Sequence, residues 1–135
     1  MATPIFAPNY TWYKSSLART NITSIAIVDS YTPTGSETES WDASATNDGS
    51  LMVYRTGNTL TIAGNGSGSI KMNEDASRMF SFSTNSKCFL NLTTITGMTL
   101  LDSSEVTLMN NMFNYCNSLT SIDVSSFITN NVTNM

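Results

Sequence analysis

The residues of this chain that could do chemistry are few, because none of its 135 residues is histidine. Without histidine, the usual serine–histidine triads, the commonest general base and most zinc sites are excluded. Cys88 and Cys116 therefore have no histidine partner to form a thiolate, and we interpret them as free thiols packed in the interior. Glu74 and Asp75 are adjacent, so on a helix they would point apart rather than form a hydrolase pair. The sequence predicts no enzyme.

Metal and cofactor sites are not indicated either. The loop acids that could hold a cation match no calcium-loop spacing, and we interpret them as solvated; they are Glu37, Glu39, Asp42 and Asp48 with Asn47. The run Gly64-x-Gly66-x-Gly68 lacks the ending of a phosphate loop and predicts a turn or bulge. We expect no cofactor and no metal.

Composition excludes further classes of function. Charged residues make up 12% of the chain, its net charge is -4, and six lysines and arginines are scattered along it. We therefore expect no nucleic-acid partner and no membrane insertion, since no apolar run approaches the roughly 20 residues of a span. The N-terminal residues 1–14 have no basic region and are interrupted by Pro4 and Pro8, so we expect no secretory signal.

The elements that would position any site fall into three predicted segments. Residues 1–40 are predicted to be an N-terminal arm and first strand serving as an anchor, with the strand inside 21–31. The anchor candidates are Tyr10, Trp12 and Tyr13, which dock either on the chain's own β domain or on a partner. Residues 41–75 are predicted to be a β-hairpin leader domain, with strands at 50–55 and 59–63 and a helix over 73–80 that begins at Asn73.

The third segment, residues 76–135, contains a repeat. Val106 and Val132 are separated by 26 residues, and so are Met109 and Met135. A period of 20 to 29 residues with leucine and isoleucine at fixed offsets is typical of a leucine-rich-repeat solenoid, whose turns stack to bury one face. We expect a short strand in each turn, such as 120–124. The predicted repeat core is Met79, Phe80, Leu92, Ile95, Leu101, Val106, Met109, Met112, Phe113, Cys116, Leu119, Ile122, Val124, Phe127, Val132 and Met135. The predicted fold class is thus mainly β with short helices, a small N-terminal β domain followed by leucine-rich-repeat-type solenoid turns.

The pattern M-x-x-M-F-x-x-C-x-S-L-T-S-I-D-V-S-x-F-x-T-x-N-V-T-N-M over 109–135 resembles the BspA-like, DUF285-type leucine-rich repeats. These repeats occur in surface proteins of gut and oral bacteria, in mycoplasmas and in phages. The run at 41–70 is similar to the β-rich leader that often precedes them, so the resemblance covers about 41–135. Departures are an irregular first turn over 79–109, and Ile128 and Asn130 where the family more often has Asp and Ser.

The resemblance implies a surface protein, and we predict a phage virion structural protein: a head fibre, decoration or tail-associated protein. Its N-terminal arm would contact capsid or tail proteins, and its repeats would bind a host-surface glycan or protein, with Tyr54 and Tyr115 as carbohydrate-facing candidates. Homo-oligomers, including trimers, are expected by analogy. Because the chain closes on V-T-x-M without a capping repeat, the repeats are predicted to continue beyond residue 135. The alternatives are a bacterial cell-surface adhesin fragment and a stand-alone cytosolic interaction module.

Overall fold

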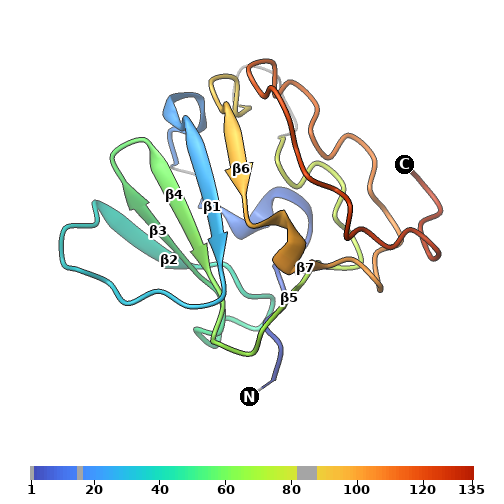
Figure 1. Ribbon diagram of the computed structural model, residues 1–135, viewed down its shortest axis with the longest axis horizontal. Helices are drawn as coiled ribbons and strands as arrows, with labels where there is room; N and C mark the ends of the chain where they lie inside the picture. Colours follow the sequence, from blue (N-terminus) through green and yellow to red (C-terminus); the bar gives the residue numbers. More distant parts are fainter. Residues whose placement is uncertain (1, 15–16, 82–87) are drawn as a thin grey trace.

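The main element of the fold is a five-stranded mixed sheet in the order β2-β3-β4-β1-β6 (Figure 1). The computed structural model describes residues 2–14, 17–81 and 88–135. The strands of the sheet are β1 Ser24–Val28, β2 Glu39–Asp42, β3 Met52–Thr56, β4 Thr59–Ala63 and β6 Thr94–Thr96. β2, β3 and β4 pair antiparallel, whereas β1 pairs parallel to both β4 and β6.

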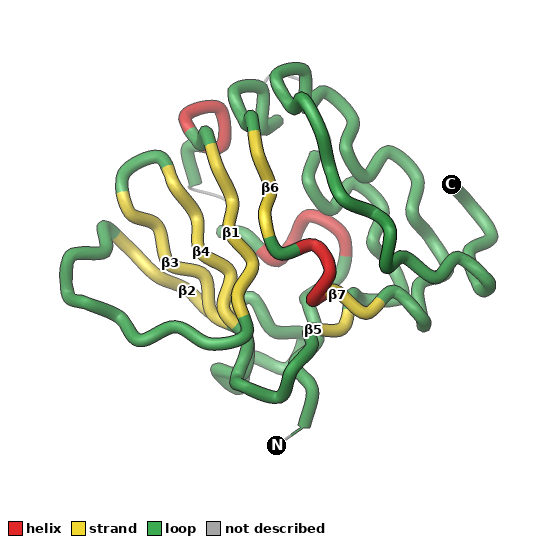
Figure 2. The backbone as a smooth tube through the Cα atoms, in the orientation of Figure 1, coloured by secondary structure: helices red, strands yellow, loops and turns green. Residues whose placement is uncertain are grey.

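The remaining elements are small. β5 (Ile70–Lys71) and β7 (Leu101–Asp102) form a two-stranded parallel sheet. Three short 3-10 helices, η1 (Asn9–Trp12), η2 (Arg19–Asn21) and η4 (Met98–Leu100), complete the described elements. Figure 2 shows that the chain after β7 is loop and turn over its whole length.

The first strand and the hairpin form as the sequence predicts. Ile25 and Ile27 are buried and alternate with half-buried neighbours, so β1 turns one face to the core and leaves the other partly accessible. The hairpin joins β3 to β4 through Gly57 and Asn58, with Thr56 paired to Thr59. Gly57 has a φ of 59°, which a two-residue hairpin turn requires and glycine adopts without strain. The predictions of a strand inside 21–31 and a hairpin over 50–63 are confirmed.

The predicted fold class is wrong. The structure is a mixed α/β fold with few helices, and the residues that it describes show no solenoid or repeat architecture. Residues 120–124 are not a strand. After β7, the bridges that the structure describes are isolated ones that join Leu108 to Asp75 and to Asn134. The apolar spacing of the repeat was a guide to burial, but it did not specify a ladder of strands.

A recurrent turn motif occurs along the chain, and one copy, at Asp123, lies in the expected strand 120–124. The sequence D-x-S occurs at Asp42, Asp48, Asp75, Asp102 and Asp123, and in each case the aspartate carboxylate accepts a hydrogen bond from the serine N–H. These distances are between 2.8 and 3.1 Å. A carboxylate that captures an N–H two residues on favours a turn over a helix or strand.

The predicted helix over 73–80 is wrong for the same reason. Asn73 accepts from the N–H of Asp75, and Asp75 accepts from the N–H of Ser77. Arg78 has a φ of 56°, outside the right-handed helical region. Asn73 also donates its side-chain amide to the Phe6 carbonyl at 3.0 Å, which ties this turn to the N-terminal segment. The expected N-cap therefore acts as a turn residue.

The sheet draws on all three predicted segments. β1 comes from 1–40, β3 and β4 from 41–75, and β6 from 76–135, while β2 spans the boundary at residue 40. Buried side chains from all three also join one hydrophobic cluster, which includes Phe6, Leu60 and Phe89.

We expect stability to fall in acid because loop carboxylates are hydrogen-bonded in the folded chain. The pKa of Asp48 is lowered from 3.8 to about 2 by hydrogen bonds from the Ser50 hydroxyl and N–H. The pKa of Glu37 is lowered from 4.5 to about 2 by the N–H of Thr34 and the Tyr31 hydroxyl. Because these folded-state pKa values lie below the ordinary values, the stabilisation is present above pH about 4 and is lost toward pH about 2.

Urea unfolding between pH about 6 and about 2 measures this effect, and the midpoint is expected to drop across the lower half of that range. Asp48→Asn is the matched variant, because asparagine can still accept from Ser50 but does not titrate. It should show a smaller drop than the unchanged chain. A midpoint that stays constant down to pH about 2 would contradict the assignment.

Candidate functional site

An apolar groove of about 400 Å³ lies on the C-terminal part of the molecule. Its apolar lining residues are Met109, Met112, Phe113, Val124, Phe127 and Met135, and the polar ones are Asn111 and Thr129. None of these side chains is ionisable, so the part of the groove lining that the structure describes offers no acidic, basic or charged nucleophilic side chain. Its chemistry is that of a surface that packs against another apolar surface.

Backbone hydrogen bonds between two distant segments build one wall of the groove. The Met109 N–H donates to the Asn134 carbonyl at 2.8 Å, and the Thr133 N–H donates to the Thr107 carbonyl at 2.8 Å. These bonds place Met109 beside the segment that carries Met135. The buried Phe80 side chain holds Phe113 in place, since the two rings stack with centroids 5.4 Å apart. The groove thus rests on the hydrophobic core.

The structure divides the predicted repeat core into three groups. Eight residues are buried, namely Met79, Phe80, Leu92, Ile95, Leu101, Val106, Met109 and Met112. Six are partly buried, namely Phe113, Cys116, Leu119, Ile122, Phe127 and Val132. Val124 and Met135 are exposed, at 44% and 75% of their accessible surface. Six members of the set meet in the groove, and the others support it or pack in the main core.

The anchor candidates lie mostly inside the protein. Trp12 and Tyr13 are buried, and Tyr10 is partly buried. Trp12 Nε1 donates to the Met79 carbonyl at 2.7 Å, and the Tyr13 hydroxyl donates to the Ser81 carbonyl. Burial raises the pKa of Tyr13, so its hydroxyl stays protonated. Of the two alternatives for these aromatics, the structure places Trp12 and Tyr13 on the chain's own core.

The remaining candidate residues, two tyrosines and two cysteines, lie in different environments. Tyr54 packs on Tyr31 with ring centroids 4.9 Å apart, whereas Tyr115 is 41% exposed. Neither cysteine forms a disulfide, and Cys116 donates its thiol to the Phe80 carbonyl at 3.0 Å. Burial raises the pKa of Cys116 to about 12, so it is not a thiolate at neutral pH. No group of metal-binding side chains occurs within the described ranges.

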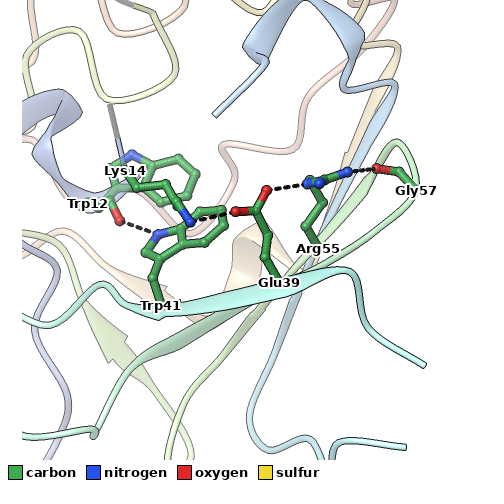
Figure 3. Close-up of polar contacts among 6 residues, drawn as sticks. All are labelled: Trp12, Lys14, Glu39, Trp41, Arg55 and Gly57. Atoms are coloured by element: carbon green, nitrogen blue, oxygen red, sulfur yellow. Dashed lines mark hydrogen bonds and ion pairs between the residues drawn. The ribbon is translucent and has the colours of Figure 1, made fainter. Parts of the chain in front are cut away.

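A charged cluster beside β2 was not predicted. Glu39 lies between Lys14 and Arg55, with Oε1 2.5 Å from Lys14 Nζ and Oε2 2.5 Å from Arg55 Nε (Figure 3). The Lys14 ammonium also lies 5.6 Å from the centre of the Trp41 ring, and Trp41 Nε1 donates to the Trp12 carbonyl at 2.9 Å. The signal in the sequence was the alternation of β2, which puts Glu39 and Trp41 on the same face.

Comparison with known proteins assigns neither a family nor a function to the chain. No family model, curated protein or solved structure matches the chain. The resemblance to BspA-like repeats therefore stays a prediction from the residues. The helices that the structure describes are 3-10 turns of three or four residues, and none of them is long and apolar enough to cross a bilayer.

Proposed function

We propose that the chain is a non-enzymatic structural protein of a phage particle, which contacts a second particle protein through the C-terminal groove and binds the host surface. The observation that carries the proposal is the groove itself, whose lining holds six apolar side chains and no ionisable one. Covering such a surface with an apolar partner is favourable, whereas nothing in it can transfer a proton or attack a bond. The location in a phage particle rests on the resemblance.

The particle contact is assigned to the groove rather than to the aromatic side chains of the N-terminal arm. Trp12 and Tyr13 are buried, so a partner could reach them only by opening the core. Val124 and Met135, in contrast, present their side chains at the surface of the groove. A bacterial cell-surface adhesin fragment remains the second candidate, because the resemblance includes surface proteins of bacteria.

Particles purified from a culture that carries the gene test the proposal by mass spectrometry. We expect the protein at a fixed copy number per particle, and we expect the double variant Val124→Lys and Met135→Lys to lower that number at least tenfold. A lysine in an apolar contact loses its hydration without gaining a partner. Thr96→Lys, on the exposed face of β6, is the matched control and should keep the normal copy number.

Two outcomes would overturn the proposal. Recovery of the protein only in the host envelope fraction would favour the adhesin, and recovery only in the cytosol would favour a stand-alone module. Equal copy numbers for the double variant and the control would remove the groove from the contact while leaving the particle location in place.

A further inference from the structure

A second pocket differs from the groove in the chemical character of its lining. It has a volume of about 240 Å³ and lies between the η2 segment and the turn that joins β3 to β4. Asn21 and Ile22 line it from the first segment, Asn58 from the turn, and Glu39 and Arg55 from the strands. Unlike the groove, this pocket therefore combines charged groups and side-chain amides.

One carboxylate at the pocket is shared by two cations. Glu39 is the one carboxylate that lines it, and this group already pairs with both Lys14 and Arg55. Hydrogen bonds from Lys14 and then Arg55 lower the pKa of Glu39, so it is ionised at neutral pH. Two of the six cations of a chain with net charge -4 thus meet one carboxylate at the pocket.

Arg55 can accept a further anionic partner. Its Nε donates to Glu39 at 2.5 Å and its Nη1 donates to the Gly57 carbonyl at 2.8 Å. A guanidinium has five N–H donors in a planar fork, and these bonds use two of them. Its side chain is 25% exposed, so the fork is both held in place and reached from solvent. Such an arrangement favours a carboxylate, which is planar and can accept two parallel bonds.

We propose that this pocket binds the carboxylate of an acidic sugar, a hexuronic acid unit of a surface polysaccharide. Arg55 takes the carboxylate, and the exposed amides of Asn21 and Asn58 meet ring hydroxyls. At about 30 Å³ for each water, the pocket holds about eight waters, the space of one sugar ring rather than a chain. The inference deepens the proposed host-surface binding and rests on it for the source of the ligand.

Titration of the purified chain with D-glucuronate, followed by NMR, tests the inference. We expect shifts of the Asn21, Asn58 and Arg55 amide signals that saturate at millimolar glucuronate. D-glucose and sulfate serve as probes of the ring alone and the charge alone, and we expect both to bind at least tenfold more weakly. Sulfate as tight as glucuronate would overturn the sugar assignment, and glucose as tight would overturn the carboxylate assignment. No shift with glucuronate would overturn both.

Arg55→Gln should weaken glucuronate binding at least tenfold, and Arg55→Lys should weaken it less because it keeps the charge but loses the fork. Lys71→Gln is the matched control, since Lys71 forms a comparable ion pair with Glu105, 3.1 Å apart, away from the pocket. It should leave binding unchanged. Arg55→Lys with unchanged affinity would overturn the bidentate contact. Because these measurements use the purified chain, their failure leaves the particle-fractionation result standing, and the converse also holds.

Discussion

Replacing Gly97 with alanine is expected to destabilise the fold by about 3 kcal/mol or more, through two effects at one position. Gly97 has a φ of 83°, in the left-handed region that costs an L-residue about 1–2 kcal/mol. A methyl group there would also lie 1.9 Å from the carbonyl oxygen of Ile27. That oxygen belongs to the backbone of β1, so it cannot move aside without shifting the strand. The variant must part β6 from β1, and the parallel pairing of Ser24 with Thr94 is lost with it.

Gly49→Ala separates the two effects. Gly49 has nearly the same φ, 80°, but a methyl group there would meet nothing within 4 Å. It should therefore show only the backbone cost, about 1–2 kcal/mol. Urea unfolding of both variants at neutral pH gives the comparison. Equal losses would mean that β1 and β6 do not approach as closely as the structure places them.

Gly97 also shows why part of the sheet could not be predicted. β1 and the hairpin follow from local patterns: the alternation of Ile25 and Ile27, and a glycine in the turn at Gly57. The pairing of β1 with β6 joins Ser24 to Thr94 across 70 residues, and no local pattern specifies which strand takes that edge. Gly97 is part of the reason that this approach is possible, but a single glycine after a short Thr-rich strand does not by itself indicate a close approach of two backbones.

The repeat illustrates a different limit. Leu92, Ile95, Leu101 and Val106 are buried, so the spacing of apolar residues correctly marked the inward positions. Spacing reports burial and not the backbone conformation between buried residues. Aspartate side chains can decide the latter: Asp123 accepts from the N–H of Ser125, and the chain turns where a strand was expected.

The residues of the groove could be predicted from the sequence, whereas the pocket at Glu39 could not, and the difference has a physical reason. The six apolar residues of the groove were all singled out, because apolar side chains at regular spacing stand out in a chain rich in Ser, Thr and Asn. The pocket at Glu39 was missed because Lys14, Glu39 and Arg55 are far apart in sequence. Each is an ordinary surface charge until β2, β3 and the N-terminal segment bring the three together.

Trp12→Ala is expected to cost about 3–5 kcal/mol, a large share of the 5–15 kcal/mol that stabilises a typical domain. Trp12 is fully buried, and its ring contacts Phe6, Tyr13, Phe80 and Phe89 at centroid distances of 5.0–6.4 Å. Truncation leaves a cavity among these rings. It also removes the hydrogen-bond donor to the Met79 carbonyl.

Trp12→Phe divides the loss between packing and hydrogen bonding. Phenylalanine keeps most of the ring contacts but cannot donate to Met79, so about 1–3 kcal/mol should remain, part of it from the unsatisfied carbonyl. Val124→Ala, at a 44% exposed position, should lie within about 0.5 kcal/mol of the unchanged chain. If Trp12→Ala proved as mild as Val124→Ala in urea unfolding, the side chain would not be part of the core. The N-terminal aromatics would then be free to dock on a partner, and the particle contact would return from the groove to the arm.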